Sequence, residues 1–107
     1  MINVEASMGQ DGAFSLTAEG HAHADRNEHD HDLVCCAVST IMCTLANSCV
    51  RLDDVSTVYH DRPGYGHVLV TNVTEDMWGE VESRFCMAMD GLEVLAMQYP
   101  KSVRINV

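Results

Sequence analysis

The chain has 107 residues, 47% of them hydrophobic, which suffices for one domain over residues 1–107 but not for two. Its net charge is −10, from 16 acidic and 6 basic residues. This charge argues against direct binding of nucleic acid or an anionic membrane, because phosphate contacts need Lys and Arg. It suits a basic partner, or it merely keeps the protein soluble. We expect neither a membrane-spanning stretch nor a signal peptide.

The first twenty residues predict a β-hairpin. Residues 1–7 alternate between apolar and polar side chains, and residues 13–19 alternate again. Residues 9–12 lie between these runs and contain Gly and Asp, which favour a tight turn. Gly20 ends the second strand.

A buried helix and a second hairpin are expected next. Residues 33–52 are apolar or small at almost every position and contain neither Gly nor Pro, which is typical of a buried helix. Asp32 occupies the expected N-cap position and Arg51 the last turn, where the helix dipole favours a cation. Two short β-branched runs, residues 55–59 and 67–73, then predict the hairpin.

The last third of the chain predicts an amphipathic helix and a final strand. Apolar residues recur at helical spacing along one stripe: Met77, Val81, Phe85, Ala88, Leu92, Leu95 and Tyr99. Pro100 stops this helix, and residues 102–107 alternate as a strand. The predicted order β-β-α-β-β-α-β is that of an α+β domain, with two helices packed on a largely antiparallel sheet.

The stretch between the first hairpin and the first helix carries candidate catalytic residues. If Asp32 caps the helix, Cys35 lies in its first turn, where unpaired N–H groups and the dipole favour a thiolate. His21 is separated from Cys35 by thirteen residues, a loop long enough to bring an imidazole to the thiol. Ser39 shares a face with Cys35, whereas Cys36 points about 100° away and is expected in the core. A buried, inert Cys35 and a solvated His21 remain the alternative.

The same stretch permits a metal-binding alternative. Histidines and aspartates are concentrated in it: His21, His23, Asp25, His29, Asp30, His31 and Asp32. Imidazole and carboxylate groups suit zinc, nickel or copper, but the spacing matches no structural zinc pattern. We therefore expect weak, adventitious metal binding, and neither a functional metal nor another cofactor.

The number of cysteines bears on the cellular compartment. There are five: Cys35, Cys36, Cys43, Cys49 and Cys86. An odd number without a secretory signal disfavours a disulfide framework and indicates a reducing, cytoplasmic environment.

Two segments together resemble the ribosomal-processing cysteine protease family, Prp. These are Gly20-His21-Ala22 and Asp32-Leu-Val-Cys35-Cys-Ala-Val-Ser39, which are similar to the family's pattern G-H-A followed by D-[IL]-V-C-x-A-V-S. The M-I-N-V start, the R-I-N end and the order of elements extend the resemblance over nearly the whole chain.

The resemblance implies a bacterial cytoplasmic hydrolase, a homodimeric cysteine endopeptidase that removes the N-terminal extension of a large-subunit ribosomal protein. Cleavage in that family follows a pair of aromatic residues and precedes Ala or a similar small residue. The motif would make Cys35 the nucleophile and His21 the base. Asp32 and Ser39 match its other polar positions, with supporting roles, and Gly20 would permit the turn that presents His21.

Three features differ from the family's usual pattern. The loop between His21 and Cys35 is slightly longer, Asp30 stands where a Gly is expected, and Cys36 replaces an Ala. A loop without glycine is expected to be less mobile, and Cys36 adds a second thiol beside the nucleophile. Two functions in other classes stay open: a non-catalytic ribosome-assembly protein that binds a basic ribosomal segment, and the histidine-rich metal-binding domain.

Overall fold

The structure, a computed structural model, describes residues 1–22 and 28–106, although the side chains of residues 28–32 lie outside the description. Its described elements follow the predicted order: β1 (Ile2–Gln10), β2 (Ala13–Gly20), α1 (Glu28–Val50), β3 (Ser56–Arg62), β4 (Tyr65–Thr71), α2 (Glu75–Gln98) and β5 (Val103–Asn106). The predicted α+β fold is therefore confirmed.

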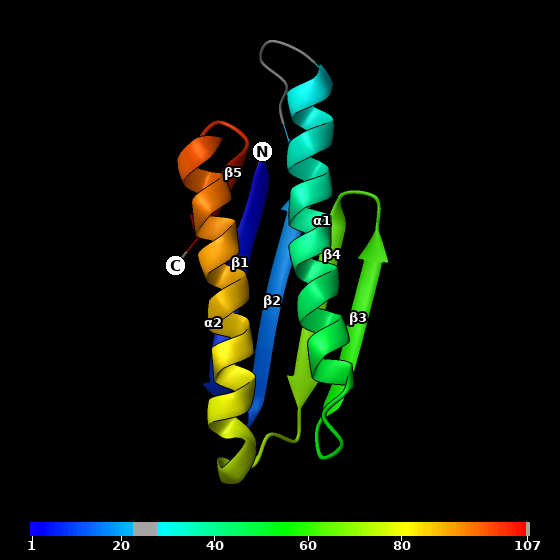
Figure 1. The fold of residues 1–107 in the computed structure, drawn as a ribbon, viewed down its shortest axis with the longest axis vertical. Coiled ribbons are helices and arrows are strands. Elements are labelled where there is room, and N and C mark those ends of the chain that lie inside the picture. The colour runs from blue at the N-terminus through cyan, green and yellow to red at the C-terminus, as the bar shows by residue number, and fades with distance from the viewer. Residues whose placement is uncertain (23–27, 107) are drawn as a thin grey trace.

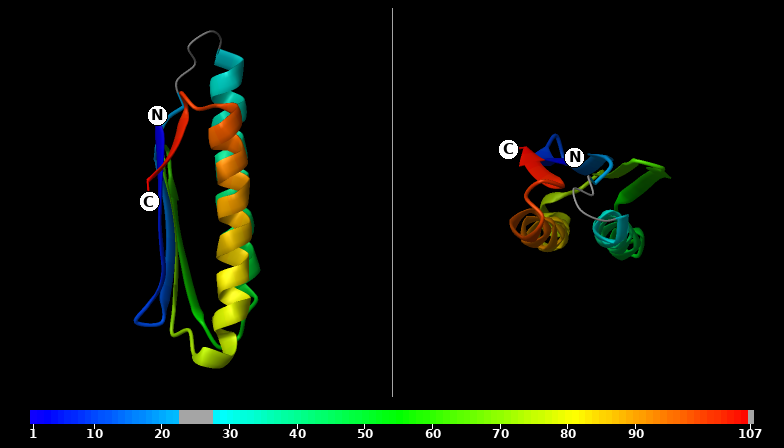
Figure 2. Two further views of the ribbon diagram at one scale, coloured as in Figure 1. Left: turned by 90° about the vertical axis from the view of Figure 1, so that its left-hand side faces the viewer. Right: turned by 90° about the horizontal axis from the view of Figure 1, so that it is seen from above.

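The strands form one twisted sheet in the order β3-β4-β2-β1-β5. Three neighbouring pairs are antiparallel, and β5 pairs with β1 in parallel. Figure 1 shows why: α2 runs back along the sheet after β4 and delivers the chain to the β1 edge. Both helices cover the same face of the sheet, and neither lies on the other face (Figure 2).

The core lies between the helices and the sheet. Alternate strand residues are buried there, among them Val4, Phe14 and Leu16, as the period of two requires. The ring of Phe14 lies 5.1 Å from that of Trp78 and 5.6 Å from that of Phe85, between centroids. Full burial of each large side chain contributes roughly 1.5–3 kcal/mol, so this contact fixes α2 on the sheet.

The predicted stripe of α2 is confirmed along its central turns. The buried residues of α2 are Val81, Phe85, Ala88, Leu92 and Leu95, and Met77 and Tyr99 are half-buried at its two ends. The helix ends at Gln98, with Tyr99 as its C-cap residue, because Pro100 cannot continue it.

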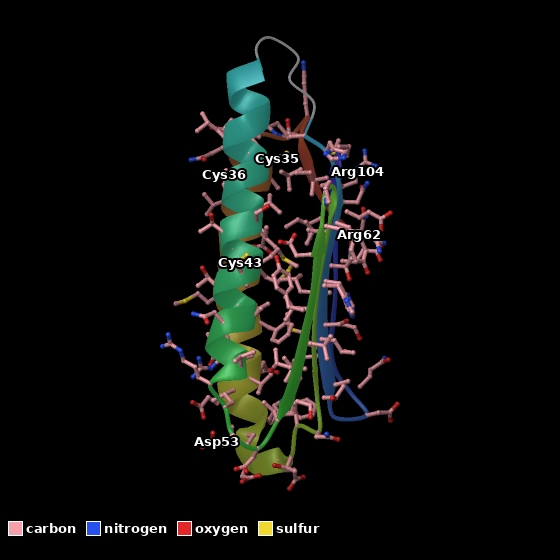
Figure 3. All side chains as sticks on the ribbon, turned by 90° about the vertical axis from the view of Figure 1, so that its right-hand side faces the viewer. Cys35, Cys36, Cys43, Asp53, Arg62 and Arg104 are labelled. Carbon is pink, nitrogen blue, oxygen red and sulfur yellow. The ribbon has the colours of Figure 1, made fainter. Side chains whose placement is uncertain are left out.

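Three predictions about α1 were wrong. The helix begins at Glu28, not after Asp32, because the sequence from 28 to 32 contains no Gly or Pro and acidic residues are favourable in a first turn. It ends at Val50, so that Arg51 follows the helix. Cys36 is exposed, and Figure 3 shows it on the solvent side of α1, since the buried positions face the sheet.

The expectation about membrane spans also needs correction. The segment Leu33–Val50 of α1, with a mean hydropathy of 1.9, is long and apolar enough to cross a membrane by length and composition alone. It is also the helix that packs on the sheet, with a third of the segment buried, and core helices of this kind meet the same criterion.

Two glycines of α2 test how tightly the helices pack. A Cβ at Gly79 would have no neighbour within 4 Å, whereas a Cβ at Gly91 would lie 3.1 Å from Cδ1 of Ile41 on α1. Alanine favours a helix over glycine by about 1 kcal/mol. We expect Gly79→Ala to raise the free energy of unfolding by about that amount and Gly91→Ala to gain less, as measured by urea denaturation. Equal gains would mean that Ile41 does not limit the approach of the two helices.

Candidate active site

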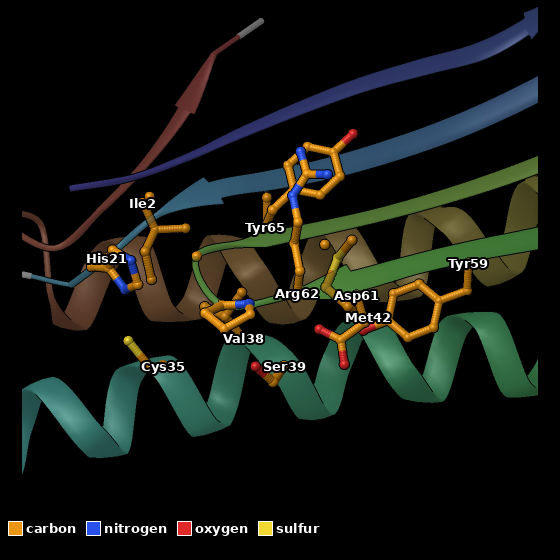
Figure 4. Close-up of a pocket in the computed structure, with 15 residues that line it drawn as sticks. Ile2, His21, Cys35, Val38, Ser39, Met42, Tyr59, Asp61, Arg62 and Tyr65 are labelled. Carbon is orange, nitrogen blue, oxygen red and sulfur yellow. The ribbon is translucent and has the colours of Figure 1, made fainter.

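A cavity of about 480 Å³ lies beside the first half of α1, at the end of the sheet where β2 stops and the β3–β4 hairpin turns. Its wall combines residues from β1, β2, α1 and the hairpin (Figure 4). The floor of the cavity is formed by small residues of the sheet: Gly66 of β4 pairs with Ala18 of β2 on one side, and with Asp61 of β3 on the other. Small side chains on neighbouring strands leave the space beneath α1 unfilled.

Gly20 and Gly64 hold the segment that presents His21. The Gly20 N–H donates to the Gly64 carbonyl oxygen over 2.8 Å. Gly20 has φ +116°, and a Cβ there would lie 2.1 Å from the Met1 carbonyl oxygen. Only glycine fits this position, so the turn role predicted for Gly20 has a steric basis.

The His21 ring lies against the hairpin turn. A Cβ added at Gly64, which has φ +74°, would come within 2.6 Å of Nε2 of His21. The hairpin tip therefore sets how closely the imidazole approaches that wall. His21 is exposed and borders the cavity.

The opposite wall is α1, which contributes Cys35 and Ser39. The Cys35 side chain is half-buried, and in Figure 4 it projects from α1 toward the side of the cavity where His21 lies. Ser39 follows one turn later and is exposed. Four of the five predicted site residues, Gly20, His21, Cys35 and Ser39, thus border one cavity. The fifth, Asp32, is a residue whose side chain lies outside the description.

The prediction that Cys35 occupies the first turn of its helix was wrong. Because α1 begins at Glu28, Cys35 lies about two turns inside it, where each backbone N–H bonds to the carbonyl four residues earlier. Neither the helix end nor a free amide of Cys35 is available to stabilise a thiolate or an oxyanion. That stabilisation has to come from side chains that border the cavity.

The β3–β4 hairpin supplies wall residues that sequence reasoning missed. Tyr59 lies between the hairpin and α1, and its hydroxyl is 3.4 Å from Sγ of Cys43. Burial raises the pKa of Tyr59 above its ordinary value, and the hydrogen bond with Cys43 and the charges of Cys43 and Asp61 raise it further. The phenol therefore stays protonated at neutral pH. Tyr59 and Asp61 gave no local signal, because they read as ordinary alternating strand residues.

The metal-binding alternative falls mainly on residues whose side chains are not described: His23, Asp25, His29, Asp30, His31 and Asp32. Among the residues that are described, no group of three or more His, Cys, Asp or Glu side chains could hold a metal ion. His60 and His67 stack on each other, with ring centroids 6.4 Å apart, and neither borders the cavity.

The comparisons with known proteins identify a family. The family model described as cysteine protease Prp matches residues 1–104. Two relatives, the ribosomal processing cysteine proteases Prp of Staphylococcus aureus strains Mu50 and NCTC 8325, are each 24% identical over 111 residues. These alignments cover 99% of this chain and 98% of each relative.

Solved structures show the same fold. The crystal structure of the Prp protease of S. aureus with a covalently linked product peptide superposes with a TM-score of 0.73 at 20% identity, covering 99% of this chain and 98% of the other. A structure from Streptococcus mutans gives a TM-score of 0.68 at 27% identity, covering 99% and 92%. With the family model matching nearly its whole length, the chain belongs to the Prp family of cysteine proteases.

Proposed function

We propose that the chain is an endopeptidase that removes the N-terminal extension of a large-subunit ribosomal protein, with Cys35 as nucleophile and His21 as base. The observation that carries the proposal is that these two residues, from separate elements, border one cavity in a chain of the Prp family. The relatives are named for ribosomal processing. A charge of −10 also suits a basic ribosomal segment, and five free cysteines suit the cytoplasm.

In this mechanism the Cys35 thiolate attacks the scissile carbonyl carbon, and a C–S bond forms as the carbonyl π electrons move to oxygen. The His21 imidazolium then protonates the leaving amine, the C–N bond breaks, and an acyl-enzyme remains. Neutral His21 next takes a proton from water, whose oxygen attacks the thioester carbonyl carbon. The C–S bond then breaks, the new carboxylic acid leaves, and the thiolate and imidazolium with which the cycle began are restored.

The supporting groups follow from the cavity wall. Ser39 lies one turn beyond Cys35 on the same side of α1, and its hydroxyl is a hydrogen-bond donor to the substrate backbone or the developing oxyanion. Gly20 gives the chain the turn that presents His21. Asp32 acts from the motif position three residues before Cys35.

Four proteins test the assignment on a peptide that spans an aromatic-aromatic-Ala junction with basic residues downstream. We expect the wild type and Cys36→Ala to cut it, because Cys36 points to solvent. Cys35→Ala should be inactive, and His21→Ala should lose about 10²–10⁴-fold in kcat, measured by mass spectrometry of the products. If the wild type cuts neither this peptide nor the full ribosomal protein under reducing conditions, the protein binds the ribosomal segment without cleaving it.

Gly64 offers a test of the wall that holds the imidazole. Gly64→Ala should lower kcat about tenfold or more by displacing His21, in addition to the strain of a left-handed residue, about 1–2 kcal/mol. Gly12→Ala is the matched control: it has φ +72° and meets the Val73 carbonyl oxygen at 3.0 Å, so it shares the strain but does not border the cavity. If both variants retain full kcat, contact with Gly64 does not position His21.

We also propose that the protein is a homodimer joined through the outward face of α1. Residues 33–50 contain no charged side chain, and their exposed members outside the cavity wall are Leu33, Cys36, Thr40, Cys43, Thr44, Asn47 and Val50. Two molecules of charge −10 repel each other, so an uncharged surface is where they can meet. Most of these side chains are small, which allows two helices to approach closely.

A single added charge tests this interface. We expect a dimeric mass for the wild type at micromolar concentration in light scattering, and at least tenfold weaker association for Thr40→Glu, because it would bury a carboxylate. Ser83→Glu places the same group on the exposed side of α2 and should stay dimeric. A monomeric wild type would overturn the dimer.

A further inference from the structure

Asp61 places a carboxylate in the wall of the catalytic cavity. Successive residues of a strand point to opposite faces, so Tyr59 and Asp61 face the helices, whereas Arg62 faces the open side of the sheet. In Figure 4 the Asp61 carboxylate points toward α1 near Ser39, and Arg62 lies with Tyr65 on the far side of β4. The residue that pairs with Asp61 on β4 is Gly66, which offers no side chain to cover it.

This carboxylate has no counter-ion in the described part of the chain. Its nearest candidate in the sequence, Arg62, has its guanidinium carbon 4.3 Å above the Tyr65 ring centroid. The ion pair found among residues 1–22 and 33–106 does not involve Asp61: it joins Arg84 to Glu80 at 3.1 Å, on α2. Arg62 also borders the cavity, but its guanidinium stacks on Tyr65. Asp61 therefore brings a negative charge to a cavity in which many of the other wall residues are apolar or small, among them Ile2, Ala18, Val38, Met42 and Gly66.

We propose that Asp61 is a specificity-determining residue, whose carboxylate binds the ammonium or guanidinium group of a Lys or Arg side chain near the scissile bond. This inference rests on the proposed protease function and adds a preference for one substrate side chain. The Asp61 carboxylate takes no part in the proton transfers between Cys35, His21 and the substrate.

The geometry limits where the basic side chain can lie. Ser39, the part of α1 toward which Asp61 points, is four residues beyond Cys35, or about 6 Å along the helix. An extended peptide advances about 3.3 Å per residue, so the basic residue belongs roughly two residues from the scissile bond, within one to three. A side chain farther along the substrate would meet other parts of the surface.

Cleavage kinetics on matched peptides test the inference. The parent peptide carries an aromatic-aromatic-Ala junction. Within three residues of the scissile bond on either side, every position outside this junction is Lys. Each Lys is replaced in turn by norleucine. For the wild type we expect one replacement to raise KM about fivefold with kcat unchanged, the effect of one partly exposed ion pair. Asp61→Asn should show that higher KM with the parent peptide and no further rise on the replacement.

Two further proteins separate recognition from a general change of the site. Asp53→Asn removes another exposed carboxylate at the opposite end of the molecule (Figure 3) and should behave as the wild type does. Asp61→Lys should reverse the preference and cut a peptide with Glu at the sensitive position better than the parent. An Asp61→Asn protein that discriminates as the wild type does, or that loses kcat equally on all peptides, would overturn the inference.

Binding measurements keep this test apart from that of the protease function. Cys35→Ala cannot cut, and calorimetry of this variant with the parent and norleucine peptides should show the same fivefold difference in Kd. The double variant Cys35→Ala/Asp61→Asn should bind both peptides equally. If the variants discriminate in binding but the wild type does not cleave, the role of Asp61 is supported and the protease proposal is overturned. If the wild type cleaves but no discrimination is found, the protease proposal is supported and the role of Asp61 is overturned.

Discussion

The burial of one side of α1 against the sheet is the interaction on which the rest of the structure depends. Val34, Val38, Met42, Leu45 and Cys49 are all at most 5% exposed, and at about 25 cal/mol per Å² of apolar surface their burial determines which way the helix faces. Once those residues face the sheet, the helical period fixes everything else on α1. The thiol and the serine face the cavity, and the uncharged small residues face outward.

The cavity that His21 and Cys35 border exists because glycines stand where the chain segments converge. Gly66 and Ala18 leave the floor low, and Gly20 and Gly64 let the end of β2 and the hairpin turn approach to hydrogen-bonding distance. His21 is the next residue after Gly20, so this contact determines where the imidazole lies. The glycines thus shape the cavity without taking part in its chemistry.

The distribution of charge separates the surfaces of this small protein by role. Sixteen acidic residues give the whole molecule its attraction for basic partners, yet residues 33–50, which form most of α1, carry no charged side chain. Among the side chains that the structure describes, one carboxylate, that of Asp61, borders the cavity itself. Long-range attraction and local recognition therefore reside in different residues.

The sequence by itself determined the order of the elements and the α+β class, and its motif singled out His21 and Cys35, which the structure places at one cavity. Periodicity, glycine positions and a short motif are local properties that folding does not alter. The tertiary structure alone decided that the β3–β4 hairpin forms part of the cavity wall. Contacts between segments far apart in the sequence, such as that of Gly20 with Gly64, produce no local sequence pattern. It also decided that Cys36 faces solvent and that Cys35 lies well inside its helix. An apolar run shows that a helix is buried, but where it begins and which side is covered depend on the sheet against which it packs.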